Sequence, residues 1–159
     1  MNRITRFAFV AAVAFAATTS AFAQPAPAPA AAPAWPPIVT EYVLSVRKTV
    51  KTIDMAGYLA AVKNPNGALL LDVREPAEFA AGHVPGAINI PRGVLEFQIY
   101  KALGYPNKVD TDRTIYVQCQ TGGRATLATA DLKKIGFTNP VAVVMSWPDW
   151  VKAGNPSEK

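Results

Sequence analysis

Cysteine and histidine are almost missing from this sequence of 159 residues, which contains one of each. A single cysteine, Cys119, cannot form a disulfide within its own chain, and His83 alone beside it cannot complete a Cys/His zinc site. The composition therefore excludes a disulfide-rich domain and a zinc-finger type of domain. We expect no metal and no cofactor, and we expect Cys119 to act as a free thiol.

Apolar runs long enough to cross a membrane are also missing. The apolar stretch from Phe7 to Ala17 is about half as long as the roughly 20 residues that a spanning helix needs. It follows Arg3 and Arg6 and precedes Ala21-Phe22-Ala23, an order typical of a secretory signal peptide, although an uncleaved membrane anchor is the alternative. We expect cleavage after residue 23, a periplasmic or secreted protein, and no stable membrane insertion afterwards.

Charged residues are few, at 17% of the chain, with 16 Lys and Arg against 11 Asp and Glu. Removal of Arg3 and Arg6 with the signal peptide would lower the net charge from +5 to +3. So small a positive excess is a weak indication of nucleic-acid binding. No nucleic-acid partner is expected.

Two segments of different composition follow the predicted signal peptide. Residues 24–37 are almost all Pro and Ala, a composition that favours an extended linker and cannot build a core. This linker is either a spacer that holds the domain away from a membrane or partner, or an arm without a role. Residues 38–49 place Ile38, Tyr42 and Val46 on one helical face, which predicts an extra helix packed on the domain.

Strand-like and helix-like segments alternate over residues 50–154, and residues 155–159 are expected to form a tail. The expected strands are 50–53, 68–73, 87–90, 114–118 and 141–145. The expected helices are 55–62, 76–81, 94–103, 124–135 and a last one that holds Trp147 and Trp150. Parallel neighbours need crossover connections, so this alternation predicts an α/β fold: a five-stranded parallel sheet with helices on both faces.

Cys119 stands at the end of an expected strand, where ligands bind in such folds. The two glycines of Gln120-Thr121-Gly122-Gly123-Arg124 permit positive φ, which lets backbone N–H groups curl around an anion. The following helix start and Arg124 add positive charge at the same place. A lone buried cysteine is usually inert. This setting instead stabilises a thiolate and makes Cys119 the leading candidate for a reactive group.

Four sequence motifs together resemble the rhodanese (thiosulfate sulfurtransferase) family. They are the LDVREPAEF stretch at 71–79, the GHVPGAINIP stretch at 82–91, the Cys-x-x-Gly-x-Arg loop at 119–124, and Gly136-Phe137. The resemblance covers about residues 50–154 and implies a five-stranded parallel α/β domain. It also implies that the loop cysteine takes a sulfane sulfur from a donor such as thiosulfate or polysulfide, and passes it to a thiol, cyanide or protein acceptor.

The same resemblance implies roles for individual residues. Cys119 would be the nucleophile and would carry the persulfide. The residues implied to bind the substrate are Gln120, Thr121, Gly122, Gly123 and Arg124, through their backbone N–H groups and, for Arg124, through its charge. Arg74 resembles either a second contact to the anion or an ion-pair partner of Asp72.

Two further positions affect the expected chemistry. His83 resembles a residue that packs its loop, and a thiolate nucleophile needs no neighbouring base. Many relatives have a Gly-Gly before the final tryptophan helix, whereas this sequence reads VMSWPDW at 144–150. We expect Met145 and Trp147 near the cysteine loop. Their bulk would make the pocket more apolar and less suited to the small thiosulfate ion, unless both residues simply close the core.

Three functions are consistent with these residues: a sulfurtransferase, a noncatalytic module of the same fold that binds a sulfur compound or a protein, and a phosphatase or arsenate reductase of a related fold. The related phosphatases resemble Cys-x5-Arg, whereas Arg124 is the fifth residue after Cys119. A loop this short leaves little room for a tetrahedral oxyanion. We therefore favour the sulfurtransferase and keep the noncatalytic module as the alternative.

Overall fold

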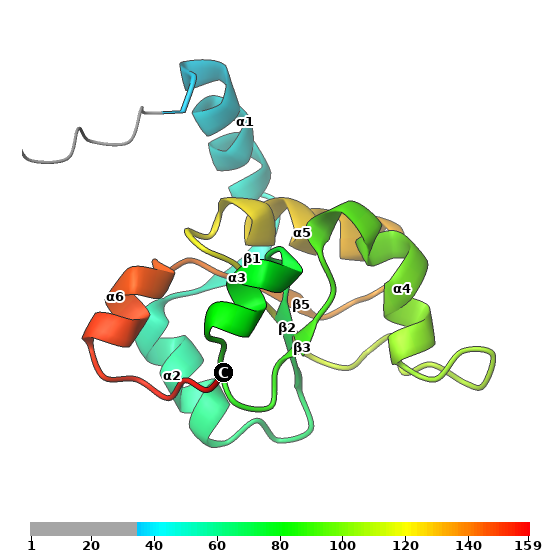
Figure 1. Ribbon diagram of the computed structural model, residues 1–159. Coiled ribbons are helices and arrows are strands. Elements are labelled where there is room, and N and C mark those ends of the chain that lie inside the picture. Colours follow the sequence, from blue (N-terminus) through cyan, green and yellow to red (C-terminus); the bar gives the residue numbers. More distant parts are fainter. Residues whose placement is uncertain (1–34) are drawn as a thin grey trace, which may run out of the picture. The chain divides into compact units, whose positions relative to one another are not determined.

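Five short parallel strands form the centre of the fold, in the order β1-β5-β4-β2-β3 (Figure 1). They are β1 (Lys51–Ile53), β2 (Leu69–Asp72), β3 (Ile88–Asn89), β4 (Ile115–Gln118) and β5 (Pro140–Val143). The computed structural model describes residues 35–159, so the predicted signal peptide and most of the predicted linker at 24–37 lie outside the described residues. The predicted five-stranded parallel sheet is confirmed.

Helices cover both faces of this sheet, as predicted. They are α2 (Met55–Lys63), α3 (Pro76–Ala81), α4 (Leu95–Ala102) after a 3-10 turn at Arg92–Val94, α5 (Gly123–Lys134) and α6 (Trp147–Lys152). Leu69 and Leu71 of β2 pack in the cluster that includes α4 and α5, while Leu70 packs in the cluster with α2 and α6. Successive side chains of a strand point to opposite faces, so a strand buried on both sides has consecutive apolar residues, as at 69–71, and Asp72 at the end of β2 is buried in an ion pair with Arg74.

Several helices begin at residues that satisfy their first backbone N–H groups. The Asp54 carboxylate accepts a hydrogen bond from the Gly57 N–H at 2.8 Å, and Ser146 accepts one from Asp149 at the start of α6. Helix α3 begins with Pro76 and with a capping box between Glu75 and Glu78. This box fixes the position of Glu78, which matters for the site below.

Residues of the expected C-terminal tail at 155–159 contact the domain. His83 donates its backbone N–H to the Glu158 carbonyl at 2.8 Å, and Glu158 donates back to His83 at 2.9 Å. The Trp150 indole donates to the Pro156 carbonyl at 2.9 Å. The His83 ring stacks on Phe79 with 3.7 Å between ring centroids, which is the loop-packing role expected of it.

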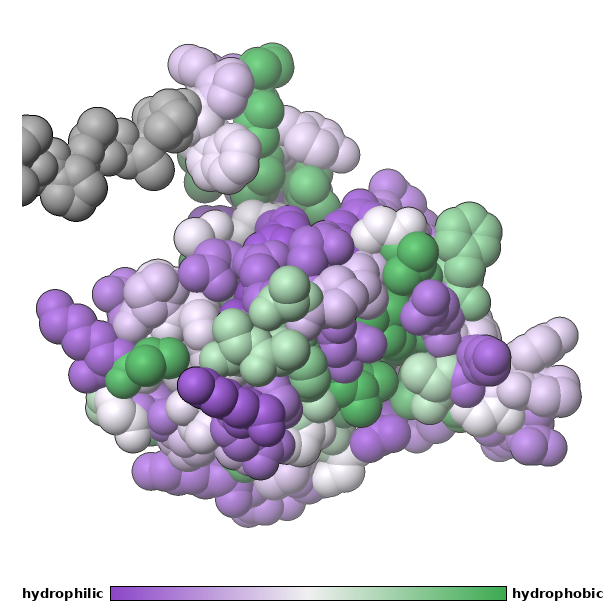
Figure 2. Space-filling view, in the orientation of Figure 1, coloured by the Kyte–Doolittle hydropathy of each residue, from purple (hydrophilic) through white to green (hydrophobic). Residues whose placement is uncertain are grey.

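The predicted extra helix is present as α1 (Pro37–Arg47), beside the start of α5 (Figure 1). No residue of α1 is fully buried. Ile38 is 71% exposed and Tyr42 is exposed too, whereas Val46 is half-buried, so the domain covers only one end of the expected apolar face. Figure 2 shows apolar surface along this helix. Polar contacts hold its end: Arg47 Nε donates to Thr126 Oγ1 at 3.3 Å, and Lys133 Nζ donates to the Thr49 carbonyl at 3.1 Å. Among residues 35–159, no helix has both the length and the apolar character needed to cross a membrane.

Candidate active site

Cys119 directly follows the central strand β4, at its carboxyl end. Its Sγ accepts hydrogen bonds from the backbone N–H groups of Gly122, at 3.2 Å, and Ala125, at 3.3 Å. The side chain is only 1% exposed. Both donors belong to the start of α5, where the helix dipole is positive, so this position favours negative charge on the sulfur. Two backbone N–H donors therefore hold the sulfur in one position at the end of β4.

The two glycines of the loop differ in conformation. Gly122 has φ of 82°, and a Cβ built there would lie 3.2 Å from the Val144 Cα and 3.3 Å from the Val143 carbonyl oxygen. Gly123 is the first residue of α5 and is not among the glycines with positive φ. Both glycines permit positive φ, but only Gly122 adopts it. Thr126 Oγ1 donates to the Gly122 carbonyl at 2.7 Å and fixes the bend.

Arg124 is paired with carboxylates of α3. Its Nη1 and Nη2 each donate to a different Glu78 carboxylate oxygen at 2.7 Å, and Glu75 lies 4.0 Å away. Hydrogen bonding by Arg124 lowers the pKa of Glu78, and the same bond raises the pKa of Arg124. An anionic donor that contacts Arg124 would therefore share it with Glu78. Sequence reasoning missed Glu78 because the pair joins positions 46 residues apart.

Arg74 takes the ion-pair role of the two that the sequence left open. Its Nε and Nη2 donate to Asp72 Oδ2 at 3.0 and 2.7 Å, and Nη2 also donates to the Gly82 carbonyl at 2.7 Å. Its side chain is 1% exposed, and its guanidinium lies 4.5 Å from the centroid of the Trp147 ring. Through these contacts Arg74 connects three parts of the fold: the end of β2, the start of α6, and the loop that follows α3. We therefore replace the expected substrate contact of Arg74 with this structural role.

Met145 and Trp147 both pack in the core cluster that includes α2 and α6, Met145 as a buried member and Trp147 partly buried against it. The Trp147 backbone N–H donates to the Gln120 carbonyl at 2.9 Å, so Trp147 adjoins the cysteine loop as expected. Neither residue lines the cavity beside the loop. The expected apolar surface does occur near the loop, but other residues provide it.

A cavity of about 740 Å³ opens beside the cysteine loop, a volume typical of small-molecule sites. The loop side of the cavity is lined by Gln120, Thr121, Gly123 and Arg124, together with Glu78 and Leu127. The opposite side is lined by residues of α1 and its approach: Trp35, Val39, Thr40, Val43, Leu44 and Arg47. The place of α1 in the wall of this cavity could not be predicted from the sequence, because a helical pattern does not say what a helix faces.

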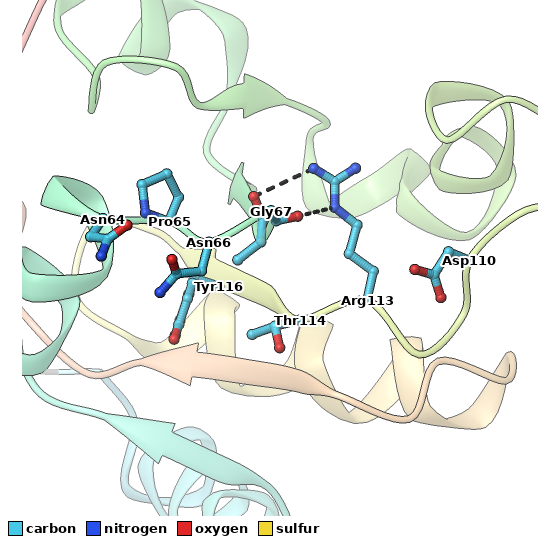
Figure 3. Close-up of a pocket in the computed structure, with 9 residues that line it drawn as sticks. Asn64, Pro65, Asn66, Gly67, Asp110, Arg113, Thr114 and Tyr116 are labelled. Atoms are coloured by element: carbon cyan, nitrogen blue, oxygen red, sulfur yellow. Dashed lines mark hydrogen bonds between the residues drawn. The ribbon is translucent and has the colours of Figure 1, made fainter.

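A second cavity, of about 370 Å³, lies at the opposite, amino end of β2 and β4 (Figure 3). The Arg113 Nε donates to the Gly67 carbonyl at 2.7 Å, and Nη2 donates to the Ala68 carbonyl at 3.4 Å. Arg113 is thus occupied in holding the turn before β2. In the part of the chain that the structure describes, no three His, Cys, Asp or Glu side chains gather closely enough to hold a metal ion. The cysteine loop remains the candidate site.

Comparison with known proteins agrees with this placement. Residues 55–153 match the rhodanese-like domain family. The chain is 38% identical over 99 residues to thiosulfate sulfurtransferase 16, chloroplastic, of Arabidopsis thaliana, covering 58% of this chain and 81% of that protein. It is 29% identical over 102 residues to YrkF of Bacillus subtilis, covering 64% of this chain but only 51% of that protein.

A solved structure shows the same fold. The polysulfide-sulfur transferase homodimer of Wolinella succinogenes has a TM-score of 0.62 and 23% identity, over 76% of this chain and 87% of that chain. The family match spans more than half of the sequence and includes the strand, loop and helix that hold Cys119. The chain therefore belongs to the family of rhodanese-like domains.

Proposed function

We propose that this protein is a sulfurtransferase that carries a sulfane sulfur as a persulfide on Cys119. The observation that carries the proposal is the Cys119 Sγ at a strand end, held by the Gly122 and Ala125 N–H groups. Sulfurtransferases among the relatives support sulfur transfer as the general activity.

The reaction has two substitution steps at sulfur. The Cys119 thiolate attacks the terminal sulfur of the donor; a Cys119–sulfur bond forms, the sulfur–sulfur bond of the donor breaks, and the leaving group takes the electron pair. With thiosulfate the leaving group is sulfite. N–H groups between Gln120 and Arg124 then cradle the outer sulfur. A thiolate, cyanide or protein acceptor attacks that sulfur, and the Cys119 thiolate is released.

Mass spectrometry of the intact protein tests this proposal. After treatment with thiosulfate or polysulfide, Cys119 should gain one sulfur atom and lose it again to cyanide or to a thiol. Cys119→Ser should gain none. If no donor adds sulfur to the wild type, the noncatalytic module becomes the better explanation. Turnover of an aryl phosphate without any sulfur adduct would instead support the phosphatase.

We also propose that the protein acts outside the cytoplasm, on the basis of the basic start, apolar stretch and Ala21-Phe22-Ala23 site in the sequence. The mature protein isolated from an envelope fraction should begin at Gln24. Amino-terminal sequencing or peptide mass mapping decides this. Intact Met1 in a cytosolic fraction would contradict export.

A further inference from the structure

We propose that the cavity beside the cysteine loop binds the organic part of the sulfur donor. The donor class is then a terminal sulfane sulfur attached to an apolar group, as in an organic persulfide or thiosulfonate, in preference to the thiosulfate ion. The assignment of the ligand as a sulfur donor rests on the proposed function. Binding of an apolar anion to the cavity can be tested apart from it.

The position of the cavity links it to the nucleophile. Gln120, Thr121, Gly123 and Arg124, all within the five residues after Cys119, line one side of it. Gly122 of the same loop and Ala125 just after it supply the N–H groups that hold the Cys119 Sγ. Cys119 itself is buried and does not line the cavity, so a molecule in the cavity lies against the loop beside the sulfur, and its terminal sulfur has to reach Cys119 past this loop.

The opposite wall of the cavity is lined mainly by apolar side chains that are exposed to solvent. Val39, Val43 and Leu44 of α1 line it together with Trp35, and Leu127 adds apolar surface from α5. Val39 is 44% exposed and Leu44 is 47% exposed. Apolar area gains free energy when it is removed from water, at about 25 cal/mol per Å². A hydrated inorganic anion cannot cover this wall favourably, whereas an alkyl or aryl group can.

The charges around the cavity also disfavour a dianion. Arg124 and Arg47 line it, but Glu78 lines it too and is bonded to Arg124, with Glu75 at 4.0 Å. The two carboxylates offset the two guanidinium charges. Thiosulfate carries two negative charges, so it gains little net attraction here. A donor with one negative charge or none meets less repulsion from Glu78.

The proposed step balances for both donor types. The Cys119 thiolate attacks the terminal sulfur of R–SO₂–S⁻; the new bond gives Cys119–S–S⁻, and the sulfinate R–SO₂⁻ leaves with the electron pair. With R–S–SH, the products are Cys119–S–SH and the thiolate R–S⁻. No external oxidant or reductant is needed, because the sulfur is only exchanged between two nucleophiles.

A series of alkanethiosulfonates tests the cavity during turnover. Methanethiosulfonate and hexanethiosulfonate anions have the same reacting group and differ only in apolar length. For the wild type we expect kcat/KM about tenfold higher with the hexyl donor. Val39→Ser and Leu44→Ser should each lower this ratio severalfold. Ile38→Ser is the matched control, because Ile38 is on the same helix, is 71% exposed and does not line the cavity.

Two results of this series would overturn the inference. One is a wild-type ratio near one. The other is a high ratio that survives both Val39→Ser and Leu44→Ser, because the apolar group would then bind elsewhere. If the wild type also accepts thiosulfate and polysulfide, either result leaves the proposed sulfurtransferase activity intact.

Binding without chemistry separates the two proposals. Hexanesulfonate has no sulfane sulfur, and its titration should change the tryptophan fluorescence of the wild type, while Trp35→Phe should lose most of the change. Such binding by a protein that transfers sulfur from no donor would contradict the proposed function and support the cavity as an apolar anion site. The inference would fail if hexanesulfonate does not bind, including the case in which sedimentation shows a dimer that covers α1.

Discussion

At the scale of single residues, the neighbours Gly122 and Gly123 differ in how well their positions tolerate a side chain. Gly122 has φ of 82°, and a Cβ there would be tightly packed, 3.2 Å from the Val144 Cα, whereas a Cβ at Gly123 meets nothing within 4 Å. Gly122→Ala should lower the free energy of unfolding by about 1–3 kcal/mol. Gly123→Ala should leave it unchanged or raise it by up to about 1 kcal/mol, because alanine favours a helix. Urea unfolding of both variants measures this, and equal losses would contradict the assigned conformations.

Two tyrosines give a second matched pair. Tyr58 is fully buried, its hydroxyl has no hydrogen-bond partner among the described residues, and burial raises its pKa well above the ordinary value. The Tyr100 hydroxyl donates to the Ile135 carbonyl. Tyr58→Phe should therefore leave the free energy of unfolding equal or higher, while Tyr100→Phe should lower it by about 1 kcal/mol. A larger loss for Tyr58→Phe in thermal or urea unfolding would show that its hydroxyl is satisfied in solution.

The sequence allowed some of these residue roles to be predicted. Cys119 was recognisable because the end of a strand, two glycines and an arginine follow one another within a few residues. The Asp72–Arg74 pair was also predictable, because it joins positions only two apart. The Glu78–Arg124 pair was not foreseeable, because it depends on how α3 and α5 meet. The constraint on Gly122 likewise comes from Val144, a residue of a different segment. Local sequence patterns are enough to propose Cys119 as the nucleophile. The residues that contact its loop from distant segments can be identified only once the fold is known.

At the scale of elements, the Glu78–Arg124 pair ties α3 to the start of α5. Arg124 holds the folded pKa of Glu78 below its ordinary value of 4.5. The pair therefore stabilises the fold above that ordinary pKa, and this contribution is lost as the pH falls through the lower folded pKa. Glu78 and Arg124 are each 33% exposed, so the contribution is no more than about 1 kcal/mol.

The pH dependence of stability tests this tie between the helices. The difference in unfolding free energy between the wild type and Glu78→Gln should be largest near neutral pH and shrink as the solution becomes acidic. In an Arg124→Ala background, Glu78→Gln should lose this pH dependence. A difference that stays constant from neutral to acidic pH, or that persists without Arg124, would show that the pair does not set the pKa of Glu78.

The elements themselves were largely predictable, with boundaries that shifted by one or two residues. The apolar run of β2 indicated a buried strand. Glycines that end helices and residues that cap their starts indicated where the helices begin and end. The face of α1 was not predictable: Ile38 and Tyr42 recur at helical spacing, yet both remain exposed. Helical periodicity identifies which residues share a face, but packing against the rest of the chain decides whether that face is covered.

For the whole molecule, burial predicts an uneven resistance to local opening. All four residues of β2 are buried, and β2 pairs with both β3 and β4. No residue of α1 is buried. In hydrogen exchange followed by mass spectrometry, peptides covering α1 should exchange first and those covering β2 and β4 last. Equal protection of α1 and β2 would mean that another molecule covers α1 in solution.

One buried thiol in this sequence also determines how the protein withstands oxidation of its cysteine. Cys119 is the one cysteine in the sequence and is 1% exposed. A sulfenic acid formed there has no second thiol in its own chain with which to condense. The loop also keeps the sulfur from the approach of about 2 Å that a disulfide with another chain requires. Recovery of an oxidised Cys119 therefore depends on a small, diffusible thiol that can enter beside the loop.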